Sequence, residues 1–144
     1  MDLKISELLA EEEKTLWVTY LDDFSVNIRY LPRRELAKIS EGSTEITWDK
    51  KTHTRIDKVN TDRFYSRFVE KAILGWRGLT LKTLAKIVPI KLGDSDPASE
   101  VVFTKENAIE LLRSAYDLDS FLQDAILDVQ RFDGEQVDAQ KKTS

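Results

Sequence analysis

Two acidic pairs come closest to a catalytic or metal-binding arrangement. Asp22 is adjacent to Asp23, and Asp94 is two positions from Asp96. Paired carboxylates can exchange protons with a substrate, and carboxylates at alternating positions can bind calcium. Both pairs lie among turn-forming residues, where aspartate is favoured because its side chain bonds the nearby backbone. The segment 94–100 also lacks the glycine and later glutamate of a helix–loop–helix calcium site, so we predict ordinary turns.

The other chemically capable side chains are isolated. His53 is the only histidine and lies in the basic stretch 50–55, without the orienting neighbours that a catalytic base needs. The chain has no cysteine, which excludes disulfides and thiolate metal sites. Gly75 and Gly78 are separated by two residues but lack the spacing and lysine of a phosphate-binding loop. We therefore predict a protein that is not an enzyme and needs no cofactor or metal.

Length and charge narrow the class of protein. With 144 residues, 41% of them hydrophobic and 33% charged, the chain can form one domain with a buried core. A net charge of −4, with basic residues scattered among acidic ones, disfavours nucleic-acid binding. No apolar run reaches the ~18 residues of a membrane span, and no signal peptide is evident. We expect a cytoplasmic protein with one domain over residues 1–132 and a disordered, apolar-poor tail over residues 133–144.

Alternation of apolar and polar residues predicts an antiparallel hairpin near the N-terminus. A two-residue turn at Asp22-Asp23 would split the apolar residues between the two faces of the hairpin. A three-residue loop aligns them, with Asp23 in the left-handed conformation, and is the register that we predict. The alternating apolar residues are Leu16, Val18 and Tyr20 on the first strand and Phe24, Val26, Ile28 and Tyr30 on the second.

Helical periodicity dominates most of the remaining chain. Pro32 suits the first turn of a short helix that Gly42 ends. A strong helix is predicted over residues 62–76, capped by Thr61 or Asp62, and its two apolar rows are expected to form the core. These rows are Phe64, Phe68, Ala72 and Trp76, and Tyr65, Val69 and Ile73.

The C-terminal half continues this pattern. A short helix over residues 79–88 breaks before Pro89, and residues 100–103 are expected to be extended. Thr104 begins a helix, and apolar positions recur as far as Val129, so we expect two helices that pack as an antiparallel pair. The predicted fold class is α+β: a mostly helical single domain with a small N-terminal antiparallel β-hairpin.

We predict that exposed apolar side chains bind a protein partner. The polar segment 41–58 is interpreted as an extended excursion, either a second hairpin or an irregular loop. Its tryptophan is either a binding anchor or packed back onto the domain. A short amphipathic helix at the N-terminus and the outer rows of the last helices supply further surfaces. The candidate partner-binding residues are Trp48, Ile5, Leu8, Leu9, Phe121 and Leu122.

Several segments, taken in order and spacing, resemble the tail assembly chaperones of long-tailed bacteriophages and prophages. The resemblance covers most of the chain. It implies a small non-catalytic factor of the bacterial host cytoplasm, which binds the helical tape measure protein, keeps it soluble, helps recruit tail tube protein, and then leaves. The segments are 28–36, 47–53, 73–80 with its Gly75-Trp76-Arg77-Gly78 sequence, 102–108, and 121–132.

Two alternatives follow from the same residues. A structural tail protein that stays in the virion, such as a completion or connector subunit, is the rival function. A helix-turn-helix DNA-binding regulator is less favoured, because the best helices are mixed or acidic in charge. The family often makes a longer product by ribosomal slippage, and Lys141-Lys142 are either part of a slippery codon run or ordinary solvated lysines.

Overall fold

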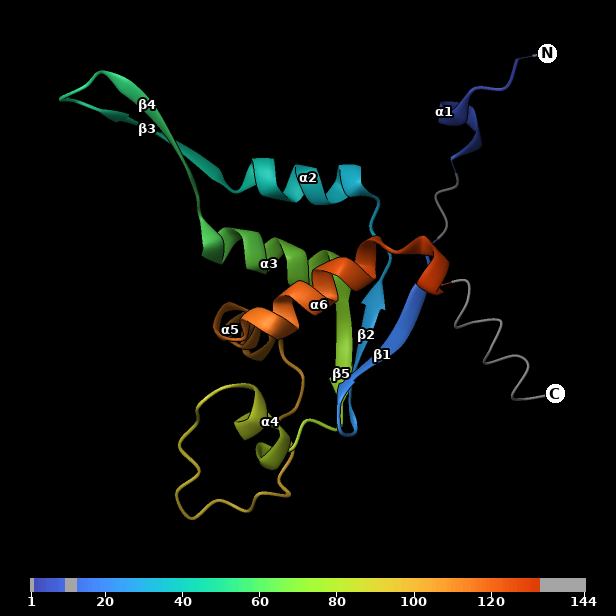
Figure 1. The fold of residues 1–144 in the computed structure, drawn as a ribbon, viewed down its shortest axis with the longest axis vertical. Helices are drawn as coiled ribbons and strands as arrows, with labels where there is room; N and C mark the ends of the chain where they lie inside the picture. The colour runs from blue at the N-terminus through green and yellow to red at the C-terminus, as the bar shows by residue number, and fades with distance from the viewer. Residues whose placement is uncertain (1, 10–12, 133–144) are drawn as a thin grey trace.

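The chain forms a three-stranded antiparallel sheet with helices on one face, and a separate two-stranded ribbon (Figure 1). This computed structural model describes residues 2–9 and 13–132. Its elements are α1 (Ile5–Leu8), β1 (Thr15–Leu21), β2 (Phe24–Arg29), α2 (Arg33–Gly42), β3 (Thr44–Asp49), β4 (Thr54–Val59), α3 (Thr61–Ala72), β5 (Ile73–Arg77), α4 (Leu81–Ile87), α5 (Lys105–Ser114) and α6 (Tyr116–Leu127). The α+β class is confirmed, but with 46% helix and 25% strand the expectation of a mostly helical domain overstates the helix.

The N-terminal hairpin has the predicted pairing of apolar residues but a different turn. Leu16 pairs with Ile28 and Val18 with Val26, so one face of β1 and β2 turns toward the core. A two-residue turn nevertheless closes the hairpin, and a bulge near Tyr20 shifts the register by one residue. Within this turn, the residue with positive φ is Asp22, at 52°. The expectation that Asp23 adopts the left-handed conformation was wrong. Because the bulge adds one residue to β1, the hairpin keeps its tight turn and the apolar residues of the two strands still pair with one another.

The helix predicted over residues 62–76 ends early. α3 stops at Ala72, and Ile73–Arg77 form β5, which pairs antiparallel with β2. Ile73 stays in the core as expected, because the strand continues directly from the buried face of α3. The N-terminal cap is the side chain of Asn60, which accepts a hydrogen bond from the Arg63 N–H at 3.0 Å. The predicted caps Thr61 and Asp62 are instead the first two residues of the helix.

The C-terminal helices cover the sheet but do not form an antiparallel pair. Only Ala115 separates α5 from α6, and one residue cannot reverse the chain direction between two helices. Figure 1 shows α5 along the line of sight and α6 across it. The start of α5 is as predicted, since the Thr104 hydroxyl accepts a hydrogen bond from the Asn107 N–H at 3.0 Å. The short helix before Pro89 is also confirmed as α4.

The core extends to the last residue that the structure describes. Phe132 is fully buried and packs edge-on against Tyr30, with ring centroids 5.7 Å apart. The predicted tail, residues 133–144, lies outside the described residues. Over residues 2–9 and 13–132, no helix combines the length and the apolar character needed to cross a bilayer.

Gly78 provides a test of how β5 joins the hairpin turn. Its φ is +74°, and a Cβ atom there would overlap the Asp23 carbonyl oxygen. We expect Gly78→Ala to lower the free energy of unfolding by ~2 kcal/mol or more, because strain and a backbone clash combine. Gly75→Ala is the control: its Cβ would have no atom within 4 Å, so a change of less than ~0.5 kcal/mol is expected. Equal effects in urea denaturation would contradict this account.

Tyr65 links α3 to α6 through a pH-sensitive hydrogen bond. Its hydroxyl donates to the Asp119 carboxylate at 2.9 Å, and burial together with this bond raises the pKa of Tyr65 to about 12. Because the folded protein holds this proton more tightly than the unfolded chain, the stabilisation is complete below pH ~10 and is lost between pH ~10 and ~12. We expect Tyr65→Phe to be less stable at pH 8, with the difference shrinking as the pH rises. A constant difference across denaturation curves would refute this linkage.

Candidate functional site

The ribbon arm, which we define as residues 44–59, exposes four apolar side chains, three on one face and Ile56 on the other. In the antiparallel pair β3–β4, Thr44 lies opposite Val59 and Ile46 opposite Asp57. Directly opposed residues share a face and successive residues alternate, so Ile46, Trp48 and Val59 lie on the same side. These side chains are 54%, 67% and 45% exposed, respectively. We call this trio the apolar face of the arm.

The arm is held firmly at its root. The Asn60 N–H donates to the Ser43 carbonyl at 2.7 Å, and the Asn60 side-chain amide donates to the Glu45 carboxylate at 2.9 Å. Ser43 is buried, and its hydroxyl donates to the Ile39 carbonyl near the end of α2 at 2.7 Å. Figure 1 shows α2 and α3 side by side, with the arm extending beyond their ends. The apolar face therefore projects into solvent in a defined direction.

The tip of the arm is positively charged. Asp49 accepts a hydrogen bond from the Lys51 backbone N–H at 2.9 Å, and this bond lowers the pKa of the Asp49 carboxyl. Within the part of the chain that the structure describes, the ammonium groups of Lys50, Lys51 and Lys58 have no carboxylate partner. His53 is exposed at the turn with a φ of 54°, as expected for a solvated loop histidine.

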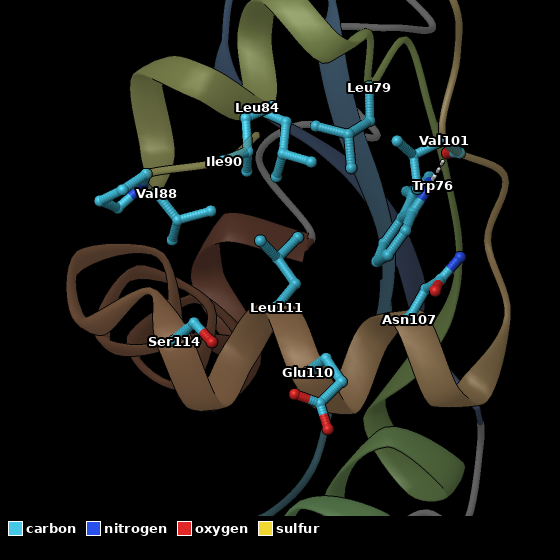
Figure 2. A pocket seen from close by; sticks show the side chains of 11 residues that line it. Trp76, Leu79, Leu84, Val88, Ile90, Val101, Asn107, Glu110, Leu111 and Ser114 are labelled. Carbon is cyan, nitrogen blue, oxygen red and sulfur yellow. Dashed lines mark hydrogen bonds between the residues drawn. The ribbon is translucent and has the colours of Figure 1, made fainter. Parts of the chain in front are cut away.

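A second candidate surface is an apolar pocket of about 390 Å³ between α4 and α5 (Figure 2). Trp76, at the end of β5, forms one wall, and its indole N–H donates to the Val101 carbonyl at 2.8 Å. The Trp76 ring also packs edge-on against Phe103, with centroids 5.1 Å apart. The other apolar lining residues are Leu79, Leu84, Val88, Pro89, Ile90, Val101 and Leu111.

The polar residues of this pocket lie on α5. Glu110 is the only titratable lining residue, and Figure 2 shows its carboxylate pointing away from the apolar side chains. The Asn107 amide donates to the Val102 carbonyl at 3.1 Å. Ser114 also lines the pocket, and Glu110, as its single titratable residue, has no partner there for an acid–base pair. The pocket thus offers mainly apolar contact, which suits the side chain of a partner.

One member of each acidic pair has a structural role. Asp22 accepts hydrogen bonds from Lys86 at 2.9 Å and from the Thr83 hydroxyl at 3.2 Å, which ties the hairpin turn to α4. The bond from Lys86 is the main cause of the lowered pKa of the Asp22 carboxyl. The Asp96 carboxylate accepts a hydrogen bond from the Ala98 N–H at 2.9 Å, as in an aspartate turn. Over residues 2–9 and 13–132, no three potential metal-ligating side chains cluster.

The N-terminal candidates are exposed but stand apart from the arm. Ile5, Leu8 and Leu9 are all exposed, in and just after the four-residue helix α1. In Figure 1, α1 and the arm lie on opposite sides of the upper part of the molecule. These three residues and Trp48 therefore do not form one site.

The two candidates on α6 differ from each other. Phe121 is half-buried, and its ring packs against Tyr20 with centroids 5.2 Å apart. Leu122 is only 2% exposed and belongs to the core, so its assignment to a partner surface was wrong. Its neighbours on the buried side of α6 are Leu118, Ala125 and Ile126, and this spacing places Leu122 inward.

Most residues of the apolar face and of the pocket are not among those predicted from the sequence. Ile46 and Val59 are not among the predicted binding residues, although the alternation from Ile46 to Trp48 is visible in the sequence. The pocket had no comparable signal, because its walls come from elements distant along the chain. Trp76, expected in the core, is half-buried at the pocket wall.

Comparisons with known proteins found no match to a family model, a curated protein or a solved structure.

The indole hydrogen bond of Trp76 is expected to hold the pocket wall in place. Trp76→Phe keeps an aromatic ring but removes the donor to the Val101 carbonyl, so we expect a loss of ~1–2 kcal/mol in unfolding free energy. We also expect faster amide exchange at Val101, whose N–H donates to the Leu79 carbonyl at 2.8 Å. The control is Trp17→Phe, since Trp17 is partly exposed and stacks on Arg77. Unchanged exchange at Val101 would show that the bond does not position this wall.

Proposed function

We propose that this chain is a tail assembly chaperone of a long-tailed phage or prophage. It acts without catalysis in the bacterial cytoplasm, binds the tape measure protein, keeps it soluble and helps recruit tail tube subunits. The single observation that carries the proposal is the apolar face of the arm. Three solvent-exposed apolar side chains on a projection fixed at its base by hydrogen bonds suit the binding of another protein.

The chemistry of a chaperone for a helical protein fits these surfaces. An aggregation-prone helix needs its apolar stripe covered, and a partner can cover it with an apolar face or groove. The arm supplies such a face, and the α4–α5 pocket supplies a recess of about 390 Å³ for an anchoring side chain. The order of segments that resembles tail assembly chaperones supports the proposal that this partner is the tape measure protein.

Co-expression tests the proposed function directly. With the tape measure protein from the same genome, we expect this chain to increase the soluble fraction of the tape measure protein and to co-purify with it. We also expect the chain to be absent from purified virions. Its presence there in fixed copy number would instead identify a structural tail protein, and failure to solubilise or co-purify would reject the chaperone function.

Trp48 is expected to be a binding residue and not a core residue. Because 67% of it is exposed, Trp48→Ala should leave the thermal unfolding midpoint nearly unchanged. Aromatic anchors at interfaces contribute ~2 kcal/mol or more, so the affinity for the tape measure protein should fall about thirtyfold or more. Ile56→Ala, on the other face of the arm, is the matched control. A parallel loss of stability and binding would mean that Trp48 is structural.

A further inference from the structure

We propose that the apolar face of the arm binds one amphipathic α-helix, which lies along the ribbon and carries acidic residues beside its apolar stripe. The inference rests on the proposed function only for the identity of the protein that supplies this helix. Three properties of the arm support it: the spacing of the apolar side chains, the width of the ribbon and the charges around the face.

The spacing of the apolar face matches a helix. Val59 is level with Thr44, so the three apolar side chains follow one another at two-residue steps along β3. Two strand residues advance ~6.8 Å. Helical residues four apart advance ~6 Å and lie on the same face. A helix parallel to the ribbon therefore brings one apolar side chain per turn to Val59, Ile46 and Trp48 in succession.

The width of the ribbon limits the partner to one helix. The two strands lie ~4.8 Å apart, and a helix with its side chains is ~10–12 Å across. One helix thus covers both strands. A strand added to the edge of β3 or β4 would use backbone groups and would leave the apolar face uncovered.

The charges around the face favour acidic residues on the partner. On the face itself, Arg55 and Asp57 neutralise each other in an ion pair of 2.8 Å. At the tip and on the opposite side, the ammonium groups of Lys50, Lys51 and Lys58 have no carboxylate partner among the residues described. A helix on the apolar face with glutamate or aspartate beside its apolar stripe brings opposite charge to Lys50 and Lys51 at the tip, whereas a lysine-rich helix is repelled.

The experiment titrates the full-length protein with designed peptides of about 20 residues, long enough for the three turns that the face requires. One peptide has a leucine stripe flanked by glutamate, and a second has lysine in place of glutamate. A third has the composition of the first in scrambled order. Calorimetry should show that the glutamate peptide binds at least about tenfold tighter than either of the others, and that added salt weakens it.

Variants of the arm assign this binding to the face. Ile46→Ser with Trp48→Ser should abolish binding of the glutamate peptide, while Ile56→Ser on the other face should leave it unchanged. Lys50→Glu with Lys51→Glu should reverse the preference toward the lysine peptide. Circular dichroism melting confirms that each variant is folded. If the double serine variant does not fold, Trp48→Ala with Ile46→Ala replaces it.

Three results would overturn the inference. The first is equal affinity for the glutamate and lysine peptides, and the second is an equal loss of glutamate-peptide binding in Ile56→Ser and in the variants of the apolar face. The third is tighter binding of a single-stranded oligonucleotide than of the glutamate peptide, through the lysines and Trp48. The outcome is separable from that of the proposed function. Co-purification with the tape measure protein without peptide binding rejects only this surface, whereas peptide binding without co-purification rejects only the proposed function.

Discussion

The burial of one face of β2 is the contact on which the rest of the structure depends. Phe24, Val26 and Ile28 are almost completely buried, and β2 is the central strand, paired with β1 on one edge and β5 on the other. Fully burying such side chains contributes ~1.5–3 kcal/mol each. Since α3 and α6 both pack against β2, removing this strand would separate the helices from the sheet as well as the strands from each other.

The continuous segment from α3 to β5 connects the core with both candidate surfaces. Asn60, immediately before α3, anchors the root of the arm, and Trp76, near the end of β5, walls the α4–α5 pocket. Between them, Phe68, Val69 and Ile73 are buried. The arm and the pocket are therefore fixed relative to each other by one stretch of packed chain, and the ring of Trp76 meets that of Phe24 edge-on at 5.9 Å.

Local patterns in the sequence predicted the hairpin, the α+β class and most helix starts, because alternation, periodicity and capping depend on neighbouring residues. The predictions were wrong where contacts between residues distant in the sequence determine the secondary structure or the burial of a side chain. Residues 73–76 continue a helical pattern, but pairing with β2 makes them a strand. Phe121 and Leu122 are adjacent and apolar, and only the packing of α6 separates the half-buried ring from the core side chain. Among the candidate binding residues, the exposure of Trp48 depended on whether segment 41–58 folds back, which no local pattern determines.

The arm can change in length at its root without any change in the packing of the core. The backbone leaves at Ser43 and returns at Asn60, where a hydrogen bond of 2.7 Å joins the two residues. Since the ends of the excursion already meet, lengthening or shortening it alters only a small loop-closure entropy. The reach of the projection can thus diverge between related chains, or be replaced by a tight turn, while the sheet and its helices keep the same architecture.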